Sequence, residues 1–202
     1  MKLGIIVGAT RQNRQSPRQA KWVYNAAKEM DDVEVEIVDL RDYALPFFDE
    51  PISPRYNQHR KIDPAARPWL KKLKEFDAYV IVTPEYNHSI PGVLKNALDY
   101  VTWEIERKPV SIVSHGSAGG ARAASQLKII ISESRAVPLP TFTPLTMIGM
   151  SEQIDEKGNL TAAGKANPRN LQAAAEEMLE ELKWYSDALA EARERVAEPA
   201  LV

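Results

Sequence analysis

Apolar runs of strand length alternate with segments of helical periodicity along most of the chain. The first apolar run covers residues 3–7, and two further runs cover residues 78–82 and 110–113. Each run is followed by a segment whose apolar side chains recur every three or four residues, which is the period of an α-helix packed on one side. Strands that alternate with helices in this way predict βαβ units around a parallel sheet.

Two more segments have the composition of edge strands. Residues 33–40 alternate apolar with charged side chains, and residues 137–147 are apolar but interrupted by Pro138, Pro140 and Pro144. Proline has no N–H to donate to a strand ladder, so it is found mainly at the edges of sheets. Together with the three buried runs, these segments predict a sheet of five strands.

The rest of the chain predicts helices and loops around this sheet. Helices are expected near residues 64–75 and over residues 168–195, where apolar positions recur at steps of four and three. Residues 44–68 lack periodicity and predict an irregular excursion, whereas residues 149–164 predict a loop. The length suits a single domain that covers residues 1–202, with the long C-terminal helix packed against it.

Composition and charge exclude several classes of function. The formal net charge is -2, and the 27% of residues that are charged are spread along the chain, which argues against a nucleic-acid partner. The absence of cysteine excludes disulfides, thiolate catalysis and cysteine zinc sites, and it fits a reducing compartment. The first apolar run is too short for a signal peptide or a membrane span. We therefore expect a cytoplasmic protein that contacts no membrane.

The loop after the first strand has the composition of a phosphate site. In an open parallel sheet, ligands bind at the carboxyl ends of the strands. Hydroxyl and arginine side chains gather in this loop, and the chain has no carboxylate before Glu29. The candidate residues are Thr10, Arg11, Arg14 and Ser16. Such side chains, with free backbone N–H groups and a helix N-terminus, favour a bound anion, and an ordinary surface loop is the alternative.

The same loop lacks the signatures of two common nucleotide-binding motifs. No Gly-Lys-Ser or Gly-Lys-Thr sequence follows the strand, which excludes a Walker-type loop. No glycine occurs between Gly8 and Gly92, so the spaced glycines that let a backbone approach a pyrophosphate are missing. A monophosphate such as that of FMN therefore suits this loop better than a dinucleotide.

Two further loops follow the buried strands at residues 78–82 and 110–113. The first can present backbone groups to a flat heterocycle, with Tyr86 as an aromatic wall. The second is the glycine-richest part of the chain, and glycine lets a backbone approach a planar ring closely. The histidines show no metal-ligand spacing, so no metal site is expected. The candidate residues are Pro84, Glu85, Tyr86 and Asn87 in the first loop and His115, Gly116, Ser117, Gly119 and Gly120 in the second.

At these loops the sequence resembles the NADPH-dependent FMN reductase family, which includes quinone, azo-dye and chromate reductases. The most specific part is the Pro-Glu-Tyr-Asn segment at residues 84–87 with residues 91–99, which is similar to the family's flavin-ring loop and following helix. Residues 8–11 are similar to the family's Gly-Ser-x-Arg phosphate loop, with Ala9 in place of the usual serine. Residues 116–120 resemble the glycine-rich third loop of the family.

The resemblance implies a flavodoxin-like three-layer α/β/α sandwich whose five parallel strands lie in the order 2-1-3-4-5. It implies an enzyme that binds FMN and passes electrons from NADPH or NADH to a small acceptor: a quinone, an azo compound, chromate or free flavin. The implied mechanism is a ping-pong hydride relay in which the cofactor carries the chemistry, so no catalytic residue is assigned. A homodimer or homotetramer is implied as well.

Rival functions exist for a fold of this kind. A non-enzymatic FMN electron carrier of flavodoxin type would use the same loops, although such carriers tend to be strongly acidic and this chain is not. A low-molecular-weight phosphatase needs a nucleophilic cysteine, and a receiver domain needs clustered acids after the first strand; the chain has neither. A flavin-free interaction protein is the third alternative, for which Ala9 is the one hint.

Overall fold

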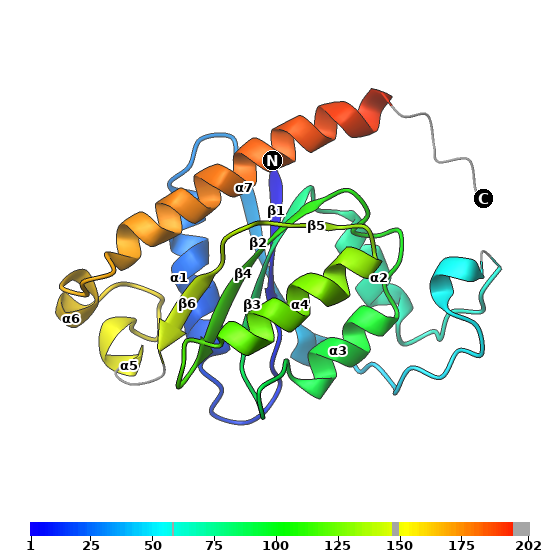
Figure 1. Cartoon of the computed structure of the whole chain (residues 1–202), viewed down its shortest axis with the longest axis horizontal. Helices are drawn as coiled ribbons and strands as arrows, with labels where there is room; N and C mark the ends of the chain where they lie inside the picture. The colour runs from blue at the N-terminus through cyan, green and yellow to red at the C-terminus, as the bar shows by residue number, and fades with distance from the viewer. Residues whose placement is uncertain (58, 147–149, 196–202) are drawn as a thin grey trace.

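The computed structural model describes residues 1–57, 59–146 and 150–195, and it forms a sheet covered by helices on both faces (Figure 1). Every pair of neighbouring strands is parallel, and the order β2-β1-β3-β4-β5 confirms the predicted order. The strands are β1 (Lys2–Val7), β2 (Glu34–Asp39), β3 (Ala78–Pro84), β4 (Pro109–Gly116), β5 (Val137–Pro138) and β6 (Thr143–Thr146).

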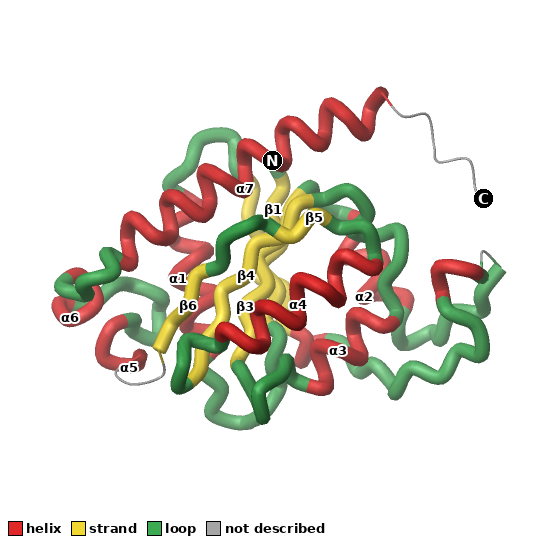
Figure 2. Tube along the Cα trace, in the orientation of Figure 1, coloured by secondary structure: helices red, strands yellow, loops and turns green. Residues whose placement is uncertain are grey.

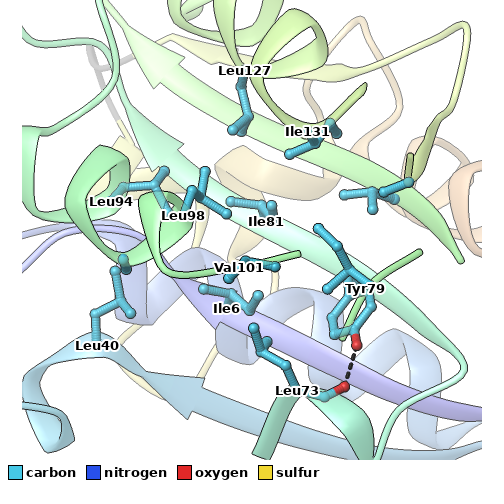
Figure 3. Close-up of a cluster of buried hydrophobic side chains, with 14 of the residues drawn as sticks. Ile6, Leu40, Leu73, Tyr79, Ile81, Leu94, Leu98, Val101, Leu127 and Ile131 are labelled. Carbon is cyan, nitrogen blue, oxygen red and sulfur yellow. Dashed lines mark hydrogen bonds between the residues drawn. The ribbon is translucent and has the colours of Figure 1, made fainter. Parts of the chain in front are cut away.

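Two separate hydrophobic clusters hold the helices on the sheet. One joins the sheet to α2 (Arg67–Lys74), α3 (Gly92–Asp99) and α4 (Ala121–Glu133). In this cluster the Tyr79 hydroxyl donates a hydrogen bond to the Leu73 carbonyl at the end of α2 (Figure 3). The other cluster joins the opposite face to α1 (Ser16–Lys28) and α7 (Leu171–Arg195). Side chains of β3 enter both clusters, which explains why this strand reads as a continuous apolar run.

The expected edge strand at residues 137–147 is divided into two short strands. β5 pairs with the start of β4, and β6 pairs with its end, so the sheet has six strands rather than five. Leu139 still donates its N–H to the Val110 carbonyl, but Pro140 has no N–H and the chain leaves the ladder there. The strand is therefore interrupted at Pro140, whereas Pro138 lies within β5 and Pro144 within β6. Residue 147 lies outside the described residues.

The segment at residues 149–164, predicted as a loop, contains short helical turns. They are α5 (Met150–Gln153) and the first part of α6 (Ala162–Lys165), whereas residue 149 lies outside the described residues. Met150 is buried against the α1 and α7 side of the sheet, and the Thr161 side chain caps α6 by accepting a hydrogen bond from Gly164 N–H. Tertiary burial and a cap thus stabilise turns that are too short to show a period in sequence.

The C-terminal helix begins at Leu171, three residues later than the predicted start at 168. Asn170 adopts a left-handed conformation with φ of 45°, and its side chain accepts a hydrogen bond from Ala173 N–H. A residue in this conformation interrupts the helical backbone, so it fixes the start. The apolar stripe of α7 packs against the sheet and α1, as the sequence predicted. No helix within the described residues is long and apolar enough to cross a membrane.

The parallel order brings the three candidate loops together. β1, β3 and β4 are neighbours in the sheet, so the loops that follow them lie at the same edge, at the bottom of Figure 1 and in green in Figure 2. The excursion between β2 and α2 contains two short 3-10 helices, η1 (Leu40–Asp42) and η2 (Pro54–Tyr56), and its first residues adjoin the loop after β1.

Candidate functional site

The loop after β1, residues 8–15, presents free backbone donors, and we call it the anion loop. Within the described residues, no backbone N–H of residues 9–15 donates to a protein acceptor. Asn13 has a φ of 54°, and α1 begins directly after the loop with Pro17 in its first turn. Successive free N–H groups beside a left-handed residue and a helix N-terminus are the elements of a backbone anion site.

Arg14 binds protein groups rather than facing outward as a free cation. Its Nη1 lies 2.7 Å from Asp39 Oδ1, its Nη2 donates to Asp39 Oδ2, and Nη1 also donates to the Ala9 carbonyl. The Arg14 side chain is only 8% exposed. The Arg14 guanidinium, predicted to contact a phosphate, ties the anion loop to the end of β2 in this structure.

Arg41, which sequence analysis did not single out, holds the next two carbonyls of the loop. Its Nε donates to the Thr10 carbonyl at 2.9 Å and its Nη2 to the Arg11 carbonyl at 2.5 Å. The Arg41 backbone N–H donates to Asp39 Oδ1 at 3.0 Å. Its position in the sequence could have indicated this role, because Arg41 lies just beyond Asp39, the last residue of β2, next to the candidate loops.

Ser16 and His115 join the start of α1 to the end of β4. The Ser16 hydroxyl lies 3.0 Å from His115 Nε2, and both residues are buried. Burial, with the nearby charge of Arg11 as a second cause, lowers the pKa of His115 to about 4. His115 is therefore neutral at pH 7. The Ser16 hydroxyl, predicted to bind a phosphate, has no exposed surface and is directed to His115.

The loop after β3 forms a tight turn that places Tyr86 beside the anion loop. Tyr86 and Ser89 exchange two backbone hydrogen bonds, and the two residues between them, Asn87 and His88, have φ values of 50° and 66°. Asparagine tolerates this left-handed conformation, so Asn87 has a role in the turn itself. The guanidinium of Arg11 lies 5.0 Å from the centroid of the Tyr86 ring.

Glu85 connects the loop after β3 to the start of α4. Its carboxylate accepts hydrogen bonds from the Arg122 side chain at 2.8 Å and from the Arg122 N–H at 3.1 Å. Burial acts to raise the pKa of Glu85, but these hydrogen bonds and one from the Ala123 N–H outweigh it and hold the pKa below its ordinary value. The Glu85 N–H also donates to the His115 carbonyl. Glu85 therefore fixes the loop after β3 to the start of α4 through its side chain and to β4 through its backbone.

The glycines at the end of β4 and in the loop after it lie where a larger side chain would clash with the protein. Gly119 and Gly120 have φ values of 71° and 74°, and a Cβ on Gly120 would lie 2.7 Å from the backbone nitrogen of His115. A Cβ on Gly119 would lie 2.8 Å from Pro144, and one on Gly116 would lie 3.2 Å from Glu85. The sequence attributed these glycines to the approach of a ring. Turn conformation and the close packing of neighbouring strands account for them directly.

The thirteen predicted site residues thus fall into two groups at one edge of the sheet. One group is buried or held by bonds within the protein: Arg14, Ser16, Pro84, Glu85, His115, Gly116, Gly119 and Gly120. The other is accessible to a ligand: Thr10, Arg11, Tyr86, Asn87 and Ser117. The accessible surface combines free N–H donors, one arginine and an aromatic ring. It suits a phosphate attached to a flat ring, whereas no cluster of three metal-ligating side chains occurs within residues 1–57, 59–146 and 150–195.

The chain is similar both to solved structures and to proteins of known activity. An oxidoreductase from Paracoccus denitrificans described as an NAD(P)H:(acceptor) flavoenzyme superposes with a TM-score of 0.71 at 21% identity, over 91% of this chain and 98% of that chain. This likeness establishes the fold. A 2-hydroxy-1,4-benzoquinone reductase from Burkholderia sp is 32% identical over 137 residues, which cover 63% of this chain and 68% of that protein.

The family itself follows from sequence. An NAD(P)H-dependent FMN reductase of Schizosaccharomyces pombe is 37% identical over 146 residues, which cover 72% of this chain and 73% of the relative. Residues 1–147 match the family model described as NADPH-dependent FMN reductase. These residues contain all three loops and every strand of the sheet. The chain therefore belongs to the NADPH-dependent FMN reductase family of oxidoreductases.

Proposed function

We propose that this single-domain protein binds FMN between the three loops at the carboxyl ends of β1, β3 and β4. The FMN-bound protein would reduce a small acceptor with NADPH or NADH. The observation that carries the proposal is the anion loop, whose backbone N–H groups from residue 9 to residue 15 have no acceptor within the described protein. Buried or constrained N–H groups without partners are costly, so a loop that keeps several of them together is suited to a ligand that accepts them.

The residues present fit the phosphate of FMN. The free N–H groups would donate hydrogen bonds to its oxygens, and the Thr10 hydroxyl and the Arg11 guanidinium would add one neutral and one charged donor. The carboxylate of Asp39 is neutralised by its ion pair with Arg14. The loop therefore presents donors without a free negative charge to oppose the ligand.

The other two loops fit the ring of the flavin. Tyr86 offers an aromatic surface beside Arg11, and the turn at residues 86–89 and the segment at residues 116–118 offer backbone groups at the same edge. When bound, FMN supplies the ability to accept and release a hydride, which no side chain of this chain has. The protein would bind the flavin, orient it and shield it from water. We assign no acid or base, because His115 is neutral and bonded to Ser16.

A single open site predicts the order of events. The loops after β1, β3 and β4 all approach from the same edge of the sheet, so a nicotinamide and an acceptor would compete for the side that these loops leave open. The two substrates then bind in turn, which gives ping-pong kinetics. Quinones, azo compounds, chromate and free flavin are the proposed acceptors; relatives named as a benzoquinone reductase and an FMN-dependent NADPH-azoreductase support the first two. A cytoplasmic homodimer or homotetramer completes the proposal.

The competing function is an electron carrier that holds FMN without reducing small molecules. Carriers of this kind depend on charge to dock their partners, and the net charge of -2 on this chain gives no such bias. The named relatives are enzymes, which also favours the reductase.

Steady-state kinetics of the purified, FMN-loaded protein test the proposal. We expect oxidation of NADPH or NADH that depends on added quinone, with parallel lines in double-reciprocal plots at several quinone concentrations. Substituting azo dyes, ferric chelates, chromate and free FMN ranks the acceptors. Intersecting lines would contradict the shared site while leaving the reductase in place. Tight FMN binding without oxidation of either nicotinamide across the panel would favour the electron carrier.

A further inference from the structure

Three successive carbonyl groups of the anion loop accept hydrogen bonds from two arginine side chains, Arg14 within the loop and Arg41 in η1. Arg14 donates a hydrogen bond to the carbonyl of Ala9, and Arg41 donates to those of Thr10 and Arg11. A peptide unit is planar, with its C=O and the following N–H pointing in opposite directions. Fixing the carbonyls of residues 9, 10 and 11 therefore fixes the N–H groups of residues 10, 11 and 12 on the other side.

Asp39 links the two arginines, and we call Asp39, Arg14 and Arg41 the clamp. Its carboxylate accepts hydrogen bonds from both terminal nitrogens of Arg14 and from the backbone N–H of Arg41. The bidentate pair with Arg14 is largely buried, with 8% and 25% of the two side chains exposed. A paired, bidentate guanidinium has a fixed position and orientation. Asp39 belongs to the last position of β2 and pairs in register with Val7, so the clamp starts from the sheet itself.

We propose that Asp39, acting through Arg14 and Arg41, is the positioning residue that sets the backbone donors of the anion loop for a phosphate monoester. The proposal rests on the proposed function, since FMN supplies the phosphate. It assigns Asp39 a specific effect: the clamp determines how much more tightly the site binds FMN than riboflavin, which has the same ring and no phosphate. None of the three side chains needs to touch the ligand ring for this effect.

The proposal and simple electrostatics predict opposite results for the loss of the Asp39 charge. If Coulomb forces alone governed the site, removing a carboxylate near a bound dianion would tighten binding. It would also release Arg14 to approach the phosphate. If Asp39 positions the loop, its loss frees the carbonyls of residues 9–11 and binding weakens. The sign of the change therefore separates the two explanations.

The experiment is a fluorescence titration of flavin-free, full-length Asp39→Asn with FMN and with riboflavin. We expect the FMN dissociation constant to rise by roughly tenfold or more, the scale of one lost charged hydrogen bond, while the riboflavin constant changes by less than about twofold. The ratio of the two constants is the readout, and a general loss of folded protein would move both constants together. An FMN constant that is unchanged or lower in Asp39→Asn would overturn the proposal.

Two variants keep the test decisive. Arg41 is exposed, so Arg41→Ala leaves no buried cavity, and we expect it to lower the FMN to riboflavin preference with an unchanged melting temperature. Arg41→Lys should recover part of the preference, because an ammonium can reach one carbonyl in place of two. Asp187→Asn is the matched control: Asp187 is exposed on α7 and pairs with Lys183 at 2.8 Å, so both constants should stay at the wild-type values. An Arg41→Ala variant with wild-type preference would also overturn the proposal.

The same titration separates this proposal from the proposed function. If the wild-type chain binds neither FMN nor riboflavin, the proposed function fails. If the wild-type chain prefers FMN and Asp39→Asn keeps that preference, the function stands and the positioning role of Asp39 is lost.

Discussion

Arg11 belongs to the anion loop, and its exposed guanidinium lies beside Tyr86. Its backbone carbonyl is fixed by Arg41, and its side chain rests 5.0 Å from the Tyr86 ring centroid. A cation held in this way can turn toward a phosphate without breaking an ion pair. At the scale of single residues, it differs from Arg14, whose charge is already used within the protein.

We predict that Arg11→Ala weakens FMN binding by about 1.5 to 3 kcal/mol, the usual contribution of a hydrogen bond to a charged group. Equilibrium titration with FMN measures it, and the melting temperature should change little because the side chain is exposed. Arg135→Ala is the control, since Arg135 pairs with Glu106 before β4, away from the loops. Unchanged FMN affinity with a much lower melting temperature would make Arg11 a structural residue.

His115 predicts how stability depends on pH. Burial, and to a smaller extent Arg11, lowers its pKa from 6.5 to about 4 in the folded protein. As the pH falls through 6.5, the unfolded chain takes up a proton that the folded chain does not, so stability is lost between pH 6.5 and pH 4. One unit of pKa corresponds to about 1.4 kcal/mol, so the effect reaches a few kcal/mol at most.

Melting temperatures of the wild type and His115→Gln measure this contribution. Glutamine can still bond to Ser16 but does not titrate, so the wild type should lose more stability than the variant between pH 6.5 and pH 4. Carboxylates titrate equally in both proteins and cancel in the difference. Parallel pH profiles would mean that His115 accepts a proton in the folded state as easily as in the unfolded chain.

At the scale of the elements, the start of α4 depends on one glycine. Gly120 caps the helix with a φ of 74°, and its Cα lies so close to β4 that a Cβ would be 2.7 Å from the His115 nitrogen and 2.8 Å from Ser114 Cβ. The left-handed conformation alone disfavours other residues by about 1–2 kcal/mol. The close contact adds to this, because its partner is backbone and cannot move away freely.

We predict that Gly120→Ala lowers the free energy of unfolding by more than about 2 kcal/mol, measured by urea denaturation. Gly92→Ala is the matched control. Gly92 begins α3 without a positive φ, and a Cβ there would meet no atom within 4 Å. Alanine is a better helix former than glycine, so Gly92→Ala should leave stability unchanged or raise it by up to about 1 kcal/mol. Equal effects of the two substitutions would contradict the strain argument.

At the scale of the whole molecule, the sheet separates the task of folding from the task of binding. The central strands β1, β3 and β4 are buried by helices on both faces, and they end together at one edge. Loops anchored on such strands are held precisely, and their residues can change with little effect on the core. The clamp through Asp39 extends this support to β2, so all four of these strands contribute to the geometry of the site.

The sequence by itself determined the order of strands and helices, the three loops and the family. Hydrophobic periodicity is a local property, and the strands at residues 3–7, 78–82 and 110–113 all appear within longer observed strands. The loop composition led to FMN, and the family match confirms that resemblance. The start of α7 at Leu171 and the break at Pro140 were harder to predict from sequence, because each depends on a single residue.

Only the tertiary structure decided which polar side chains are free for a ligand. Arg14 and Arg11 look equivalent in the sequence, yet Asp39, 25 residues from Arg14 along the chain, pairs with Arg14 and leaves Arg11 exposed. Ser16 is likewise hydrogen-bonded to His115, which is 99 residues away along the chain. A charge or hydroxyl forms its strongest bonds with the partners that folding brings within about 3 Å. Composition can therefore predict the chemistry of a site, whereas the division between ligand contacts and supporting contacts is fixed by distances through space.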